Sequence, residues 1–264
     1  MKRHWKSFFR GITNNLLKLM VPLERALLEM PMWLFIGVTA LIAWRVSGYK
    51  IAAVSVGGLL FIAVFDLWRG AMLTMTVVGT ATFLSIALAI PVGIAMAKSD
   101  LLEGMVKPVL DMMQTMPAFV YLIPAIFFLG IGKVPAVFAT LVYAVPPAIR
   151  LTNLGIRLVS PDLIEAARAF GTTPWQLLLK IQLPLARPTI MAGVNQTVMM
   201  ALAMVVVAAL VGAGGLGADV YAGIQQLEFG RGLMGGIGIV VLAVIIDRVS
   251  QGFAKDPRGQ RSSS

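Results

Sequence analysis

Two residue types are absent or nearly so, and this excludes several kinds of chemistry. The chain has no cysteine, and its one histidine, His4, lies in a basic N-terminal segment. Without cysteine there is no disulfide framework and no thiolate nucleophile. A catalytic triad or a histidine-based metal centre is not expected, so carboxylates remain as the only strong metal ligands. No deep carboxylate pair stands out either, and we expect neither a metal site nor enzyme activity.

Charged residues are also scarce. They make up 13% of the 264 residues, whereas hydrophobic residues make up 58%. A soluble domain of this composition would leave large apolar areas in water. Apolar runs close to the ~20 residues that cross a ~30 Å hydrocarbon layer recur along the chain. We expect an all-α, polytopic helical membrane protein with about seven spans. The expected spans are 32–47, 51–66, 71–97, 112–131, 134–155, 189–212 and 235–253. The first two of these are short.

The net charge of +10 indicates contact with lipid rather than with nucleic acid. Basic residues are spread over the termini and loops and are not interleaved with exposed aromatic side chains, as nucleic-acid binding requires. Contact with anionic lipids is the better interpretation. Residues 5–27 combine apolar and basic side chains at helical spacing, which predicts an amphipathic helix at the membrane interface. A cleaved signal peptide is the alternative, but Lys18, Glu24 and Arg25 interrupt its apolar core.

The basic loops also predict the orientation in the membrane. Much of the positive charge lies in residues 98–107, 150–180 and 248–261, which should face the cytoplasm. Counting backwards through seven spans then puts the basic N-terminal segment outside, against the same rule. Either one early span is incomplete or this segment is an exception, and we favour the exception.

One polar stretch between the apolar runs has the signature of a helical hairpin. Ser160 offers an N-cap hydroxyl, and Pro161 follows at the first helical position, where its missing N–H costs nothing. Gly171 can take left-handed φ at the end of that helix, and Thr173 with Gln176 forms a second cap. We expect the apolar side to pack inward and the charged side to meet water or protein. The inward set is Leu163, Ile164, Ala167, Phe170, Leu177, Leu178 and Ile181. An ordinary solvated loop is the alternative.

A second stretch, residues 111–121, combines a proline kink, polar groups, flexible methionines and an aromatic side chain. Membrane helices tolerate such breaks where neighbouring helices or a water-filled cavity satisfy the freed carbonyls. The stretch is either ordinary interhelical packing or part of a transport pathway, and the polar pair after Val194 allows the same two interpretations. The candidate pathway residues are Gln114, Thr115, Met116, Pro117, Tyr121, Asn195 and Gln196.

The hairpin carries a family resemblance. Its residues Glu165, Ala166, Ala167, Gly171, Ile181, Leu183 and Pro184 resemble the EAA loop of permease subunits in binding-protein-dependent ATP-binding cassette (ABC) importers. Within that class, residues 98–99, 107–111, 113–124 and 152–157 are similar to the glycine betaine/proline betaine branch, the ProW/OpuAB type. The resemblance covers about residues 30 to 253.

This resemblance implies a type I ABC importer fold in the bacterial cytoplasmic (inner) membrane. It implies a homodimer with two cytoplasmic ATPase subunits and an external substrate-binding protein, moving a quaternary ammonium solute such as glycine betaine, proline betaine or choline. The hairpin would couple to the ATPase through Glu165, Ala166, Ala167, Gly171, Leu183 and Pro184. No cofactor is expected in this chain, because ATP and Mg would be bound by the ATPase. A Gly-Lys-Ser/Thr phosphate loop is accordingly absent.

The expected organisation has four parts. Residues 1–30 form the basic amphipathic segment, 31–69 two accessory spans, 70–254 the permease core with the hairpin at 160–184, and 255–264 a polar tail. A secondary transporter or channel is the competing class. It would need intramembrane charges, and the central spans offer few beyond Asp111. The transported solute and any control by ionic strength or lipid stay open.

Overall fold

The computed structural model describes residues 2–254, with side chains for residues 10–252. Within that range every regular element is a helix, so the all-α class is confirmed. Met1 and the predicted tail at 255–264 lie outside the described residues, and the His4 side chain does so too.

The helices follow one another with short connections. They are α1 (Lys2–Glu29), α2 (Met32–Ser47), α3 (Tyr49–Val64), α4 (Trp68–Lys98), α5 (Asp100–Thr115), η1 (Ala118–Tyr121), α6 (Leu122–Leu129), α7 (Lys133–Arg157), α8 (Pro161–Ala169), α9 (Pro174–Leu177), η2 (Leu178–Gln182), α10 (Leu183–Ala209), α11 (Leu216–Gln225) and α12 (Phe229–Ala254).

Fewer of these helices qualify as spans than the seven segments expected. Among the described residues, four continuous runs are long and apolar enough to cross a membrane by themselves, and the count rises to at most six when each strongly bent pair is one span. All seven expected segments are nevertheless helical wholly or in part. The short length expected of the first two is confirmed, since α2 and α3 have 16 residues each. At about 1.5 Å per residue, 16 residues fall short of the ~30 Å hydrocarbon layer.

The expected span at 112–131 is helical in two parts, and the break between them lies at the proline kink that the sequence predicted. Helices α5 and α6 are bent by 110° where η1 joins them. Met116 before Pro117 takes an extended backbone with ψ 134°, because the proline ring disfavours helical geometry in the preceding residue. The chain therefore breaks inside this segment and leaves the polar Gln114 and Thr115 next to the bend.

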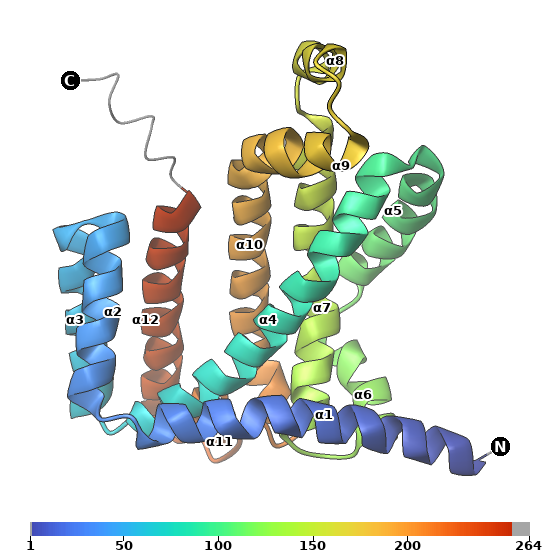
Figure 1. The fold of residues 1–264 in the computed structure, drawn as a ribbon. Coiled ribbons are helices and arrows are strands. Elements are labelled where there is room, and N and C mark those ends of the chain that lie inside the picture. The colour runs from blue at the N-terminus through green and yellow to red at the C-terminus, as the bar shows by residue number, and fades with distance from the viewer. Residues whose placement is uncertain (1, 255–264) are drawn as a thin grey trace.

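The hairpin projects from one end of the molecule, which we call the hairpin end, and α1 and α11 lie across the opposite end (Figure 1). In the centre, α7 packs between α4 and α10. Helix α1 thus lies at the end of the molecule opposite the hairpin, and the side of the membrane on which it lies stays a prediction. Met20 of α1 is 1% exposed and packs with Val77, Ala81 and Val137.

The accessory pair α2 and α3 packs beside α12 (Figure 1). Leu59 and Ile62 of α3 lie in one buried cluster with Trp68, Leu242 and Ile245 of the core. At the hairpin end, the Ser47 hydroxyl donates to the carbonyl oxygen of Arg248 over 2.8 Å. The pair is therefore attached to the middle of α12 and, one turn further on, near its C-terminal end.

Candidate coupling site and transport pathway

The hairpin folds as its local sequence predicts. Helix α8 begins at Pro161, and Gly171 follows its end with φ +76°. Both bonds of the capping box are present: the Gln176 N–H donates to Thr173 Oγ1 over 3.3 Å, and the Thr173 N–H donates to Gln176 Oε1 over 3.0 Å. The expected capping bond from Ser160 was wrong. Ser160 occupies the N-cap position, but its side chain forms no capping hydrogen bond.

The buried face of the hairpin is smaller than expected. Ala167, Leu177 and Leu178 are buried, but Phe170 is 91% exposed and Leu163 is 50% exposed, which corrects the expectation that both pack inward. Phe170 stands next to the glycine turn, where the hairpin projects beyond the body of the chain (Figure 1). A large aromatic side chain left in water at a projecting tip is available to a partner.

The six expected coupling residues lie on the hairpin and on the first turn of α10. Glu165 and Ala166 are exposed on α8, whereas Ala167 is buried beneath them. Leu183 is half-buried and Pro184 exposed at the start of α10, directly after the single π-helical turn η2. Such π-helical turns frequently occur at functional sites.

Two contacts hold the base of the hairpin against α4 and α5. The Lys98 ammonium lies 4.5 Å from the ring centroid of Trp175 on α9, a cation–π contact. Arg157, the last residue of α7 before the hairpin, forms ion pairs with Asp100 at 2.7 Å and Glu103 at 3.0 Å. Its guanidinium also donates to the Met96 carbonyl oxygen over 3.0 Å. We call Asp100, Glu103, Asn153 and Arg157 the Arg157 cluster.

Glu103 is fully bonded within this cluster. It receives hydrogen bonds from Lys107 and Asn153 at 2.9 and 2.7 Å. Asp111, two turns further along α5, pairs with Arg150 of α7.

The first group of pathway candidates surrounds the break between α5 and α6. Gln114, Thr115 and Pro117 are exposed there, and Met116 is half-buried. Tyr121 is 7% exposed, donates its hydroxyl hydrogen bond to the Met113 carbonyl oxygen and stacks edge-on with Tyr143 at 5.9 Å. Tyr121 therefore fixes the geometry of the break in this chain.

The second group lies elsewhere. Asn195 of α10 donates to a carboxylate oxygen of Asp247 on α12 over 2.9 Å and accepts from the Ser250 hydroxyl, while Gln196 is exposed. Tyr121 instead packs near Met204 of α10, nine residues beyond Asn195, or about 14 Å along a helix. One chain does not bring the two groups into a single site.

The sequence analysis did not identify two sets of polar side chains at the candidate site. Asp247 is a carboxylate within an apolar helix, and that pattern alone could have identified it. The Arg157 cluster joins side chains up to 57 residues apart, and no local signal indicates such a pairing. Among the described residues, no group of three or more histidine, cysteine or acidic side chains could hold a metal ion.

A capped hairpin that projects from a bundle of broken apolar helices defines a membrane transport subunit that engages a partner. The chain belongs to the family of binding-protein-dependent transport system inner membrane components, whose model matches residues 89–258. It is therefore a multi-pass inner-membrane protein and a transport subunit rather than an enzyme.

Relatives and solved structures agree with this family. The chain is 46% identical over 257 residues to the glycine betaine/proline betaine transport system permease protein ProW of Escherichia coli (strain K12), covering 97% of this chain and 73% of that protein. It is 46% identical over 260 residues to the glycine betaine/carnitine transport permease protein GbuB of Listeria monocytogenes, covering 97% and 92%. A chain of the inward-facing MetNI methionine ABC transporter matches with a TM-score of 0.65 at 23% identity, over 70% of this chain and 93% of that chain. The fold is that of a type I ABC importer permease.

Proposed function

We propose that this chain is the permease subunit of an ATP-driven importer for a quaternary ammonium compatible solute such as glycine betaine, proline betaine or choline. The names of the two relatives support the solute class, since each names at least one small transported solute that has a quaternary nitrogen. As a member of a binding-protein-dependent family, the chain works with an ATPase and a substrate-binding protein. The finer assembly that we propose contains two copies of the chain, two cytoplasmic ATPase subunits that bind ATP and Mg, and anionic lipids.

The observation that carries the coupling proposal is the shape of the hairpin. Phe170 and Leu163 expose apolar surface at its tip, and the base is held to α4 and α5 by Trp175 and Arg157. An ATPase that moved the tip would therefore also move the start of α5, which leads into the break near Pro117. Rocking between two such arrangements would open the pathway alternately to the two sides of the membrane.

Selection of the solute is proposed to lie mostly outside this chain. A quaternary ammonium group is recognised best by several aromatic faces, whereas the pair Tyr121 and Tyr143 is the one contact between tyrosine rings among the described residues. We propose that residues 114–121 line one part of a weak, transient pathway, and that Asn195 and Gln196 line a separate part of it. Normal transport by both Tyr121→Ala and Asn195→Ala, at wild-type abundance, would contradict this.

The whole assembly tests the proposal directly. The chain is reconstituted into vesicles with its ATPase and binding protein, and uptake of labelled glycine betaine is measured. We expect uptake to require ATP and the binding protein, and to be competed by choline but not by glycine, which lacks the quaternary nitrogen. Uptake driven by an ion gradient without ATP would instead support the secondary-transporter class.

A further inference from the structure

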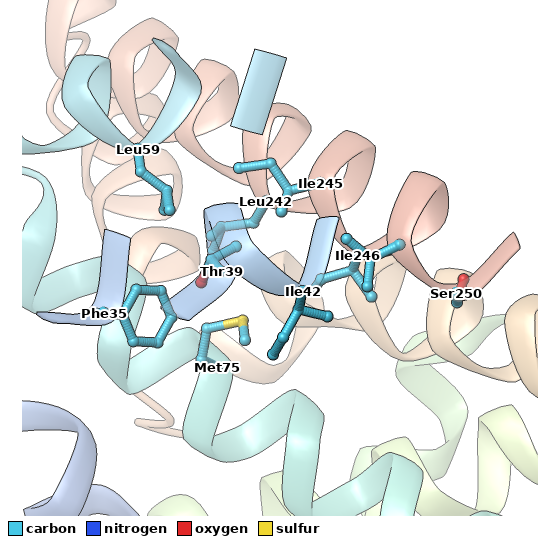
Figure 2. Close-up of a pocket in the computed structure, with 10 residues that line it drawn as sticks. Phe35, Thr39, Ile42, Leu59, Met75, Leu242, Ile245, Ile246 and Ser250 are labelled. Atoms are coloured by element: carbon cyan, nitrogen blue, oxygen red, sulfur yellow. The ribbon is translucent and has the colours of Figure 1, made fainter. Parts of the chain in front are cut away.

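A cavity lies between the accessory pair and the core, away from the break between α5 and α6. Its volume is about 270 Å³, and α2, α3, α4 and α12 all contribute to its walls. Phe35, Leu59, Met75 and Leu242 surround the space, as Figure 2 shows. Of the ten lining residues only Thr39 and Ser250 carry a hydroxyl, and no lining residue is charged.

The chemistry of the walls determines what can occupy the cavity. An apolar cavity of roughly 150 Å³ stays dry and accepts benzene, so a larger one has room for a longer hydrocarbon. An empty cavity forfeits the dispersion contacts of its lining atoms. In the hydrocarbon layer the abundant apolar solute is the lipid acyl chain. A helix of a second copy is about 10–12 Å across and does not fit a volume that equals a sphere about 8 Å across.

Uncompensated positive charge lies at the end of the cavity that faces the hairpin end. Arg45 stands one turn beyond the lining residue Ile42, and Arg248 precedes the lining residue Val249. Arg45 and Arg248 are exposed, and so is Lys50 at the start of α3. None of these three side chains forms an ion pair among the described residues. The carboxylate of Asp247 is bonded instead to Asn195 and Gln251.

Two aromatic side chains mark the depth of these cations. Trp44 is 60% exposed and Tyr49 is 70% exposed at the same end of the accessory pair. Exposed tryptophan and tyrosine are typical of the membrane–water interface, so Arg45, Lys50 and Arg248 lie at the level of lipid headgroups. Arginine is well suited to bind a phosphate there.

We propose that this cavity and its basic rim form a specific site for one anionic phospholipid. An acyl chain fills the space around Met75, and the phosphate binds Arg45, Arg248 and Lys50. The lipid joins the accessory pair to the core. The site is independent of the transported solute and of coupling to the ATPase.

Photo-crosslinking tests the acyl-chain site. The purified full-length chain is incubated with phosphatidylglycerol that carries a photoactivatable acyl chain, and adducts are mapped by mass spectrometry. We expect adducts concentrated in segments 35–42 and 242–249, and a several-fold loss of them in Thr39→Trp, whose side chain fills the cavity. Val38→Trp is the matched control, because Val38 is 45% exposed and does not line the cavity. The milder Thr39→Phe provides a second filling variant, and thermal unfolding checks that each variant is folded.

The basic rim is tested with the same assay. We expect Arg45→Gln with Arg248→Gln to lower labelling by phosphatidylglycerol several-fold and to leave labelling by phosphatidylcholine unchanged. Arg69→Gln, which removes a charge at the start of α4 near the opposite end, should change neither. Equal labelling of the wild-type chain by the two lipids would overturn the anionic site. Adducts spread evenly over lipid-exposed segments, or crosslinks between two copies through the cavity, would overturn the proposal as a whole.

Discussion

At the scale of single residues, Gly171 determines the shape of the coupling hairpin. Its φ of +76° lies in the left-handed region, and no atom lies within 4 Å of the position of an added Cβ. A substitution there is strained by backbone conformation alone and not by a clash. This makes the residue a sensitive probe of the turn.

We expect Gly171→Ala to lower ATP-driven uptake about five-fold or more at equal membrane abundance. Left-handed backbone costs a non-glycine residue about 1–2 kcal/mol, so the hairpin would populate other turn geometries. The matched control is Gly48→Ala in the turn between α2 and α3, where φ is +89° and the space is equally open. If both variants transport alike, the effect of Gly171 is not specific to coupling.

Asn195 provides a second residue-scale prediction. Asn195→Leu removes one of the hydrogen bonds to the partly buried Asp247 carboxylate and should lower the free energy of unfolding by about 1.5–3 kcal/mol, the usual contribution of a hydrogen bond to a charged group. The double variant Asn195→Leu with Asp247→Leu should recover most of this loss, since it removes both partners. Unfolding of the purified chain in detergent measures both. Additive losses would show that the bond between α10 and α12 contributes little.

At the scale of elements, the Arg157 cluster links the end of α7 to the start of α5. Arg157→Gln should lower uptake about ten-fold, as expected from a loss of roughly 1.4 kcal/mol, while the ATPase subunit still hydrolyses ATP. The physical reason is that α5 would no longer follow the hairpin. Arg157→Lys should recover only part of the activity, because one ammonium cannot reproduce the forked contacts. Parallel loss of uptake and ATP hydrolysis would indicate a docking defect instead.

Helix α1 is attached to the opposite end of the molecule by few contacts. Met20→Ala should destabilise this attachment by about 2–5 kcal/mol, the usual cost of emptying a buried methionine site. Leu19→Ala is the matched control, since Leu19 is 39% exposed. Limited proteolysis near Pro22 reports detachment of the helix. Equal protection of the two variants would mean that the ion pair of Glu24 with Lys133, 2.5 Å long, suffices to hold it.

At the scale of the whole molecule, we expect two copies of the chain in each assembly. The segment around the break exposes large apolar side chains, among them Phe119, Ile123 and Phe127 at 58%, 65% and 83%. Where these side chains face lipid, van der Waals packing against a second copy, rather than removal from water, would favour association. Native mass spectrometry of the purified assembly counts the copies. A single permease chain with full transport activity would contradict the homodimer.

The sequence predicts some features of the whole molecule and not others. Hydropathy predicted the helical segments, because each span must bury its own apolar stretch, and Pro117 predicted a kink in one of them, but neither predicted a bend of 110°. Burial of Phe170 was predicted wrongly from helical periodicity, which indicates that a helix has an apolar face but not that the chain supplies a surface to cover it. The boundaries at 30, 69 and 254 stay a prediction.

The sequence by itself determined the class of protein and the coupling hairpin. Composition dictates a membrane protein, and the caps at Pro161, Gly171 and Thr173 depend on residues at most a few positions apart. Tertiary structure decided which distant side chains meet: Arg157 with Asp100, Asn195 with Asp247, and α1 with the end opposite the hairpin. Those pairings depend on how whole helices pack, and the energy of packing is shared among many weak contacts that no local pattern encodes.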